Sequence, residues 1–364
     1  MTIVVGLPSP RPSPPGEGAR SRLQEDSTSS AAHQGAEDAE EIVPSSNVLV
    51  ALPLLGERAG VRADIFKRSG ILTLALVFLF ASGASVLAQK KPTTQPAPAP
   101  PAQRLNLPGE VSDERILELL DVGAEQLIKS GRTTKMSELL SQLNRRSCTL
   151  NLPKPTPAKL SSSDLVARAR AGIVVIGDLY KCKKCPRWHV GASSGFMLTE
   201  SGICVTCYHV VNVPESPTLV AMTGDGRVIP VKEVLAANPN TDVAILRLEG
   251  SGFTTLPLDT EAPIGSPVRV ISHPDEHFFT FSEGIIARYV SVPLEKNAGE
   301  VTMMAVTADF GAGSSGAPVF NERGGVIGMV NNTQSLYYDP KRGKDLQMVF
   351  KQCLPSQYIQ QLLK

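Results

Sequence analysis

Short hydrophobic and β-branched runs, separated by Gly, Pro, Asn and Asp, repeat along the chain from Ala171 onward. They include GIVVIG, SGFMLT, DVAILRL, PVRVIS and GGVIGMV. Short runs with turn residues between them are typical of antiparallel strands in a barrel or sandwich. The pattern therefore predicts an all-β domain over residues 160–364.

A helical pattern precedes this domain. After Ser112, a residue type that caps helices, apolar side chains recur at a spacing of three or four residues, and a second such run follows Gly131. We predict a short helical hairpin over residues 109–147. Two short amphipathic helices bury little surface alone, so we expect them to pack on the all-β domain, with contact to a partner as the alternative.

The segment from Ile71 to Ala88 is apolar and uncharged, and it follows Lys67 and Arg68. A basic stretch, an apolar stretch and small residues at the end are the parts of a secretory signal. We predict a signal peptide over residues 67–88, cleaved after Ala88, and hence a periplasmic or secreted protein. Because eighteen apolar residues can just span a bilayer, an uncleaved segment that tethers the protein to the membrane is the alternative.

The segments on either side of this signal have no apolar periodicity. We expect residues 1–66 to be a disordered extension, and since signals normally begin at the N-terminus, we hypothesise that translation starts near Val61. Residues 89–108 are rich in proline and predict an extended linker.

The charge balance narrows the range of partners. The chain has 36 basic and 35 acidic residues, which gives a formal net charge of +1. A nucleic-acid partner is therefore not expected, because such proteins carry a clear basic excess. No composition signal indicates a cofactor.

Three residues have the types and contexts that acyl transfer requires. His209 follows a hydrophobic strand, Asp242 precedes another, and Ser315 lies in the glycine-rich loop GAGSSGAPV. Hydrolysis of a peptide by acyl transfer needs a nucleophile, a base, a carboxylate that orients the base, and donors for the oxyanion. The glycines let the loop direct the backbone N–H groups of Gly313 and Ser315 at one point.

The order and context of these motifs resemble the bacterial HtrA/Deg-like group of trypsin-like serine proteases. The matching segments are Ser194-Gly195-Phe196, His209-Val210-Val211, Asp242 to Leu246, and Gly313 to Pro318. The resemblance implies a chymotrypsin-like double six-stranded β-barrel, preceded here by the helical hairpin and the disordered N-terminal region. It also implies a catalytic triad of His209, Asp242 and Ser315 in the cleft between the barrels, and an oxyanion hole at Gly313 and Ser315.

Three departures from the family pattern matter. Ala317 replaces a glycine that is common after the nucleophilic Ser-Gly, which tightens the turn but adds only a methyl group. Ser314 replaces the aspartate that pancreatic-type enzymes pair with a new N-terminus, and the peptide-binding PDZ domain of many HtrA proteins is not expected here. Ser314 is also a rival nucleophile, although the motif favours Ser315.

The expected activity is a serine endopeptidase that acts on polypeptides, namely exported or misfolded proteins. The alternative is a catalytically inert module that binds partners through the same fold. An esterase is disfavoured because the G-x-S-x-G nucleophile elbow is absent.

Asp309 lies six positions before Ser315, where trypsin-like enzymes keep the acid at the base of the specificity pocket. It predicts a preference for Lys or Arg before the scissile bond. The alternative is that Asp309 only caps a turn.

Six cysteines follow the signal, and in an exported chain an even number permits disulfides. We predict that Cys182 and Cys185 pair locally. A zinc site is the alternative, because Cys204-x2-Cys207 follows at a typical separation and His189 is nearby. Cys204 and Cys207 should point to opposite faces of one strand, which argues against a four-cysteine site, so we expect no metal.

Overall fold

The computed structural model describes residues 105–155, 158–182 and 185–364. Residues 1–66, the predicted signal at 67–88 and most of the linker therefore lie outside the described residues. None of the helices in the described part is long and apolar enough to cross a membrane. Val111–Lys364 belongs to a single compact unit.

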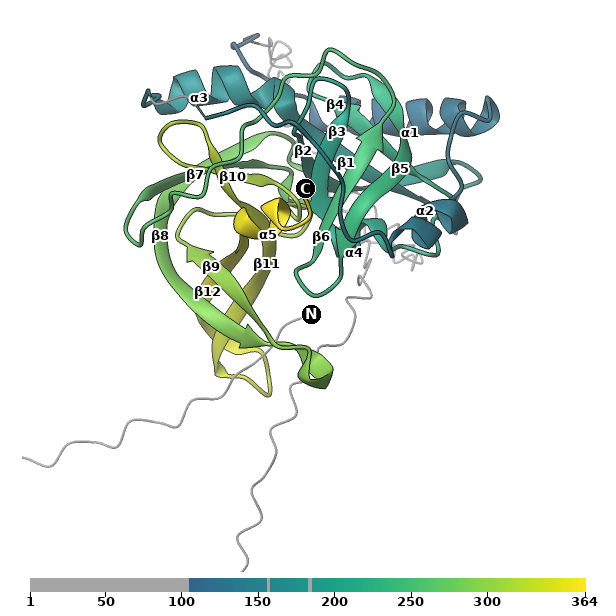
Figure 1. Ribbon diagram of the computed structural model, residues 1–364. Helices are drawn as coiled ribbons and strands as arrows, with labels where there is room; N and C mark the ends of the chain where they lie inside the picture. The colour runs from purple at the N-terminus through teal and green to yellow at the C-terminus, as the bar shows by residue number, and fades with distance from the viewer. Residues whose placement is uncertain (1–104, 156–157, 183–184) are drawn as a thin grey trace, which may run out of the picture. The chain divides into compact units, whose positions relative to one another are not determined.

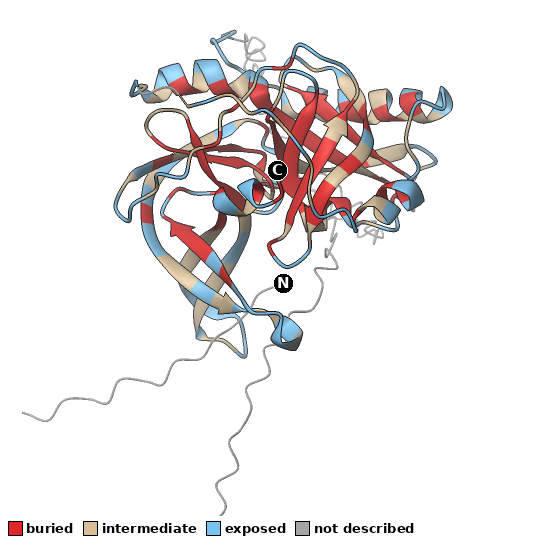
Figure 2. Ribbon diagram, viewed as in Figure 1, coloured by how far each residue is buried: buried red, intermediate tan, exposed pale blue. Residues whose placement is uncertain are grey.

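The first six strands form a closed antiparallel barrel in the order β1-β2-β3-β6-β5-β4 (Figure 1). Its strands are β1 Ile173–Lys181, β2 Trp188–Met197, β3 Ile203–Cys207, β4 Leu219–Thr223, β5 Val228–Asn238 and β6 Val243–Leu248. β3 is buried along its whole length, so the segment that leads to His209 belongs to the barrel core. Figure 2 shows this barrel as the most continuously buried part of the unit.

The last six strands close a second barrel in the order β10-β11-β12-β9-β8-β7. They are β7 Pro267–Ser272, β8 Thr280–Pro293, β9 Glu300–Val306, β10 Pro318–Phe320, β11 Val326–Asp339 and β12 Lys344–Pro355. The 3₁₀ turns are η1 Arg170–Gly172, η2 Pro274–Glu276 and η3 Glu295–Asn297. The predicted double six-stranded β-barrel is thus confirmed.

Both helices of the predicted hairpin are present, as α1 Asp113–Lys129 and α2 Met136–Gln142. Each helix packs on the first barrel: α1 lies over β2 and β5, and α2 over β5. The buried face of α1 carries Leu120, Ala124 and Leu127. The expectation that the helices pack on the all-β domain therefore holds.

Three further helices complete the described fold, namely α3 Ser162–Ala169, α4 Tyr208–Val211 and α5 Gln357–Gln360. The sequence pattern did not predict α3. The Ser161 hydroxyl caps it by accepting from the Asp164 N–H, and Leu165 on its inner face is completely buried.

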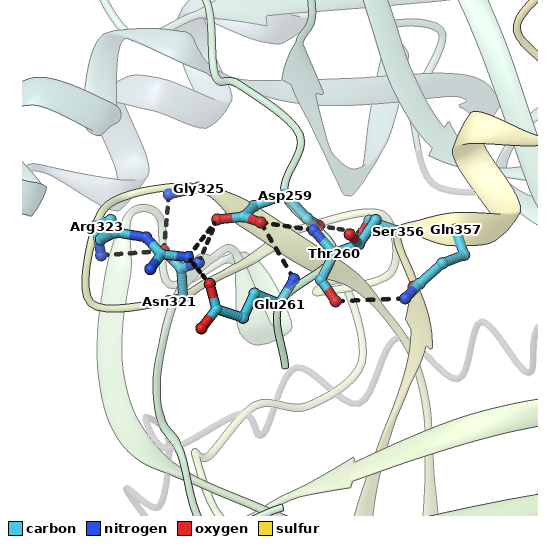
Figure 3. A network of polar contacts seen from close by, with 8 residues as sticks. All are labelled: Asp259, Thr260, Glu261, Asn321, Arg323, Gly325, Ser356 and Gln357. Atoms are coloured by element: carbon cyan, nitrogen blue, oxygen red, sulfur yellow. Dashed lines mark hydrogen bonds and ion pairs between the residues drawn. The ribbon is translucent and has the colours of Figure 1, made fainter. Parts of the chain in front are cut away.

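A polar network fixes the segment that connects the two barrels (Figure 3). The Asp259 carboxylate accepts hydrogen bonds from Arg323 at 3.0 Å, from Asn321 at 2.8 Å and from the Thr260 N–H at 2.7 Å. Burial raises the pKa of Asp259, but the hydrogen bond from Arg323 and its other donors outweigh burial and lower it overall. The network joins the connecting segment to the turn between β10 and β11, so it stabilises the second barrel where the chain enters it.

Candidate active site

His209 lies in the short helix α4, directly after the buried strand β3. The helix is held at its start because the Tyr208 N–H donates to the Asp242 carbonyl at 3.0 Å. The His209 side chain is 27% exposed, so solvent can reach the ring although the preceding strand β3 is buried.

Asp242 contacts His209 through both carboxylate oxygens. Oδ2 lies 2.7 Å from His209 Nδ1, and Oδ1 accepts from the His209 backbone N–H at 2.9 Å. Asp242 has a φ of 49°, in the left-handed region, which Asp tolerates better than most residues. The left-handed turn thus directs this carboxylate back at the histidine from the start of β6.

Asn331 on β11 is a site residue that the sequence reasoning missed. Its side-chain Nδ2 donates to Asp242 Oδ2 at 2.5 Å, and its backbone carbonyl accepts from Ser315 Oγ at 3.2 Å. One residue of the second barrel therefore contacts both the carboxylate and the hydroxyl. No local signal in the sequence marks it, because it follows an ordinary strand run.

Burial by itself lowers the pKa of His209. The adjacent Asp242 carboxylate, by its charge and its hydrogen bond, outweighs burial and raises the pKa above the ordinary 6.5. A histidine held in this way is a stronger base than one in water, and one of its ring nitrogens is fixed by the carboxylate. In the described part of the chain, His209 Nε2 has no hydrogen-bond partner.

Ser315 and its neighbour Ser314 have different surroundings. Ser314 is completely buried, and its hydroxyl donates to the Ser272 hydroxyl at 3.1 Å. Ser315 is only half-buried, and its backbone carbonyl accepts from the Ser194 N–H at 3.0 Å. Of the two serines, only Ser315 presents its hydroxyl to an incoming group.

Gly313 shapes the loop that precedes Ser315. It has a φ of 85°, and a Cβ added there would lie 2.5 Å from the His273 carbonyl oxygen. The preceding carbonyl, of Ala312, accepts from the Asp275 N–H at 2.7 Å. Within the described residues, the N–H groups of Gly313 and Ser315 donate to no acceptor, so both are available to an oxyanion.

Asp309 has surroundings that argue against the predicted preference for Lys or Arg. Its side chain is 84% exposed, and Oδ1 forms an ion pair with Lys351 Nζ at 2.6 Å. The hydrogen bond from Lys351 is the main reason that the pKa of Asp309 is lowered. An exposed carboxylate already paired with a lysine is a weak ligand for a basic substrate side chain.

Five of the six cysteines fall into two sets, and the partly exposed Cys148 lies outside both. Cys204, Cys207 and Cys353 are buried, and the Cys207 Sγ donates to the Val330 carbonyl at 3.3 Å. Cys182 and Cys185 are partly exposed, with their sulfur atoms 3.2 Å apart, and His189 joins them. No disulfide joins any of the six cysteines in the described residues, so the predicted disulfide stays a prediction, and Cys204 and Cys207 contribute nothing to the Cys182 cluster.

Residues 193–329 match the family model described as a trypsin-like peptidase domain. The match covers the segments that carry His209, Asp242 and Ser315, and it runs from within β2 to within β11. Residues 193–329 thus match a trypsin-like peptidase domain, and the two closed six-stranded barrels have the chymotrypsin-like fold.

Curated relatives make the resemblance more specific. Two are named probable periplasmic serine endoprotease DegP-like: the protein of Ectopseudomonas mendocina (strain ymp) is 29% identical over 140 residues, and that of Halomonas elongata is 31% identical over 138. Each match covers 37% of this chain and 28% of the relative. The putative serine protease HhoA of Synechocystis is 30% identical over 149 residues, 38% of this chain and 36% of that protein.

The resemblance to HtrA-like proteases is therefore confirmed for the peptidase domain, and the chain spans only about a third or less of these relatives. Among solved structures, the HtrA-type protease AlgW with decapeptide has a TM-score of 0.45 at 16% identity. That similarity covers 56% of this chain and 69% of AlgW.

Proposed function

We propose that this protein is a serine endopeptidase that cleaves polypeptides through an acyl-enzyme intermediate. Asn331 carries the proposal, because it contacts Asp242 with its side chain and Ser315 with its carbonyl. Asp242 and Ser315 lie 73 positions apart in the sequence, and Asn331 brings both of them, together with His209, to one site. The match to a trypsin-like peptidase domain supports the same reaction class.

In the proposed reaction, Ser315 Oγ attacks the carbonyl carbon of the scissile peptide bond while His209 Nε2 accepts the hydroxyl proton. The N–H groups of Gly313 and Ser315 donate to the oxyanion as the tetrahedral intermediate forms. His209 then donates the proton to the leaving amine, and water hydrolyses the ester in a second round of the same steps. Asp242 keeps Nδ1 protonated and stabilises the imidazolium.

One observation favours the inert binding module as the second candidate. The Ser315 hydroxyl donates to the Asn331 carbonyl, and in the described residues no hydrogen bond joins it to His209. Catalysis requires that this hydroxyl exchange the Asn331 carbonyl for His209 Nε2. Catalytic hydrogen bonds in unliganded enzymes often form fully only with substrate, so the endopeptidase remains the better supported function.

A fluorophosphonate probe separates the two candidates, because it labels a serine only where a base activates the hydroxyl. We expect stoichiometric labelling that Ser315→Ala abolishes and Ser314→Ala leaves in place. Casein degradation should follow the labelling. An unlabelled, folded protein would support the inert module instead.

We further propose that the substrates are exported or misfolded proteins and that the protein works in the periplasm or outside the cell. The predicted signal ending at Ala88 supports export, and two curated relatives bear the word periplasmic in their names. N-terminal sequencing of the protein from its natural host tests this: a mature chain that begins at Gln89 is expected. A protein that retains residues 71–88 in the membrane fraction would instead be tethered.

A further inference from the structure

A second cluster of reactive side chains lies away from the candidate active site, at the hairpin between β1 and β2. Cys182 follows β1, Cys185 precedes β2, and His189 is the second residue of β2. Cys182 Sγ lies 3.2 Å from Cys185 Sγ, and Cys185 Sγ lies 3.0 Å from His189 Nε2. The ligand atoms of all three residues lie within 4.8 Å of one another.

The orientation of His189 is fixed from outside the hairpin. Its Nδ1 lies 3.2 Å from Asp121 Oδ2 on α1, while Nε2 faces the cysteine sulfur. Asp121 is itself fixed, because its Oδ1 accepts from the Val190 N–H at 3.0 Å. A carboxylate that holds one ring nitrogen so that the other faces a ligand position is the arrangement found behind metal-binding histidines.

We propose that Cys182, Cys185 and His189 bind one Zn²⁺ ion, with Asp121 as the positioning residue for His189. Two thiolates and one neutral imidazole suit zinc better than calcium or magnesium, which prefer oxygen ligands. On binding, each thiol releases one proton, so the two thiolates balance the 2+ charge of the ion. Water supplies the fourth position of the tetrahedron.

The spacing of the atoms agrees with this chemistry. Zinc–sulfur bonds of about 2.3 Å place the ligands of a tetrahedral site roughly 3.7 Å apart. The observed separations of 3.2 and 3.0 Å need only a slight opening to reach that value. A disulfide needs the two sulfur atoms at about 2.05 Å, and it would leave the His189–Asp121 pair without a function.

The position of the site gives it a structural consequence. Asp121 lies on α1, which packs on the first barrel through Leu120 and Ala124, whereas the three ligands belong to the barrel hairpin. A bound ion would hold His189 in place and thereby strengthen the contact between hairpin and helix. Zinc should therefore raise the melting temperature, because a ligand that binds only the folded state stabilises it.

Metal analysis of the full chain, purified under reducing conditions without chelator, tests the proposal directly. We expect about one zinc per chain, reduced to background in Cys182→Ser and Cys185→Ser and unchanged in Cys148→Ser, which alters a cysteine outside the cluster. Replacement of zinc by Co²⁺ should give the thiolate-to-cobalt charge-transfer absorption and the visible bands of a tetrahedral site. These readouts do not depend on peptidase activity, so they are independent of the proposed function.

The role of Asp121 has a test of its own. Asp121→Asn should weaken zinc affinity about 10- to 100-fold in competition with a chelating dye. Glu125→Gln, one turn further along α1 and paired with Lys129, should leave the zinc affinity unchanged.

Equal zinc content in the cysteine variants and the parent protein, or a Cys182–Cys185 disulfide that persists in protein from the natural host, would overturn the zinc site. Equal affinity in Asp121→Asn would overturn the positioning role.

Discussion

The Asp113 carboxylate accepts a hydrogen bond from the Phe278 N–H at 3.0 Å, which joins the first turn of α1 to the loop between β7 and β8. The same loop contains Asp275, whose N–H donates to the Ala312 carbonyl next to Gly313. The loop includes left-handed non-glycine residues at Asp275 and Phe279, conformations that persist only where their surroundings hold them. Helix α1 thus supports, through this loop, the N–H groups proposed for the oxyanion.

Removal of that support should reduce turnover. Asp113→Ala leaves the Phe278 N–H without its acceptor, and we expect kcat to fall roughly five- to tenfold, because one lost hydrogen bond outside the site costs about 1 kcal/mol. Glu114→Ala is the matched control. Glu114 lies in the same helical turn as Asp113, but its carboxylate forms no ion pair among the described residues, whereas that of Asp113 also contacts His277. Steady-state assays on casein-derived peptides check the pair, and equal kcat values would show that α1 does not support the site.

Asn331 should act as a positioning residue for Asp242. Asn331→Ala removes the donor 2.5 Å from Asp242 Oδ2, and we expect kcat to fall about 10- to 100-fold. Because the carboxylate then keeps more negative charge, the pKa of His209 should rise further and shift the pH profile to higher pH. Thr333→Ala, at an exposed position two residues further along β11, should have little effect. A fall in kcat without any shift of the profile would indicate a purely structural role.

The raised pKa of His209 determines how activity depends on pH. The general base must be neutral, so kcat/KM should rise with pH and reach half its maximum above 6.5. Asp242→Asn removes the charge that raises this pKa, so the residual activity should have its midpoint at lower pH. Rate profiles of parent and variant check the order, and a higher midpoint in the variant would contradict it.

The protonation of His209 should also affect stability, and in the opposite direction. Activity should rise with pH, whereas the contribution of His209 to stability should fall. Because the folded pKa of His209 is raised, its pairing with Asp242 contributes stability that is fully present below the ordinary pKa of 6.5 and is lost as pH rises through the folded pKa. In a Ser315→Ala background that prevents self-cleavage, His209→Ala should therefore cost more unfolding free energy at about pH 6 than at about pH 9. Urea denaturation at the two pH values measures it, and an equal cost would refute the linkage.

The sequence predicted those parts of the molecule that depend on local patterns. The strand runs predicted an all-β barrel or sandwich, and the contexts of His209, Asp242 and Ser315 predicted the candidate site. The resemblance to HtrA-like proteases implied that there are two barrels. Asn331 was missed because its role arises from contact between β11 and the first barrel, which no local pattern records. Asp309 has the expected spacing, but Lys351 on β12 neutralises it.

The cysteine cluster shows the same limit. The spacing of Cys182 and Cys185 allowed a disulfide or a zinc site, and the sequence favoured the disulfide. Asp121 lies 68 residues before His189, on a helix expected only to pack, and its contact with that histidine favours the metal. Tertiary contacts thus supply an argument for the proposed metal site that spacing alone does not contain.

The loop around Ser315 should tolerate a methyl group at one glycine and not at another. Gly316 has a φ of 90°, and a Cβ there would overlap the Ser194 carbonyl oxygen, whereas a Cβ at Gly311 meets only Pro274 Cβ at 3.7 Å, an ordinary contact. Gly316→Ala should therefore lower the free energy of unfolding by at least about 2 kcal/mol and abolish probe labelling. Gly311→Ala should remain folded and labelled. Because both variants add the same methyl group within one loop, equal stability and labelling would mean that the left-handed turn at Gly316 is not required to present Ser315.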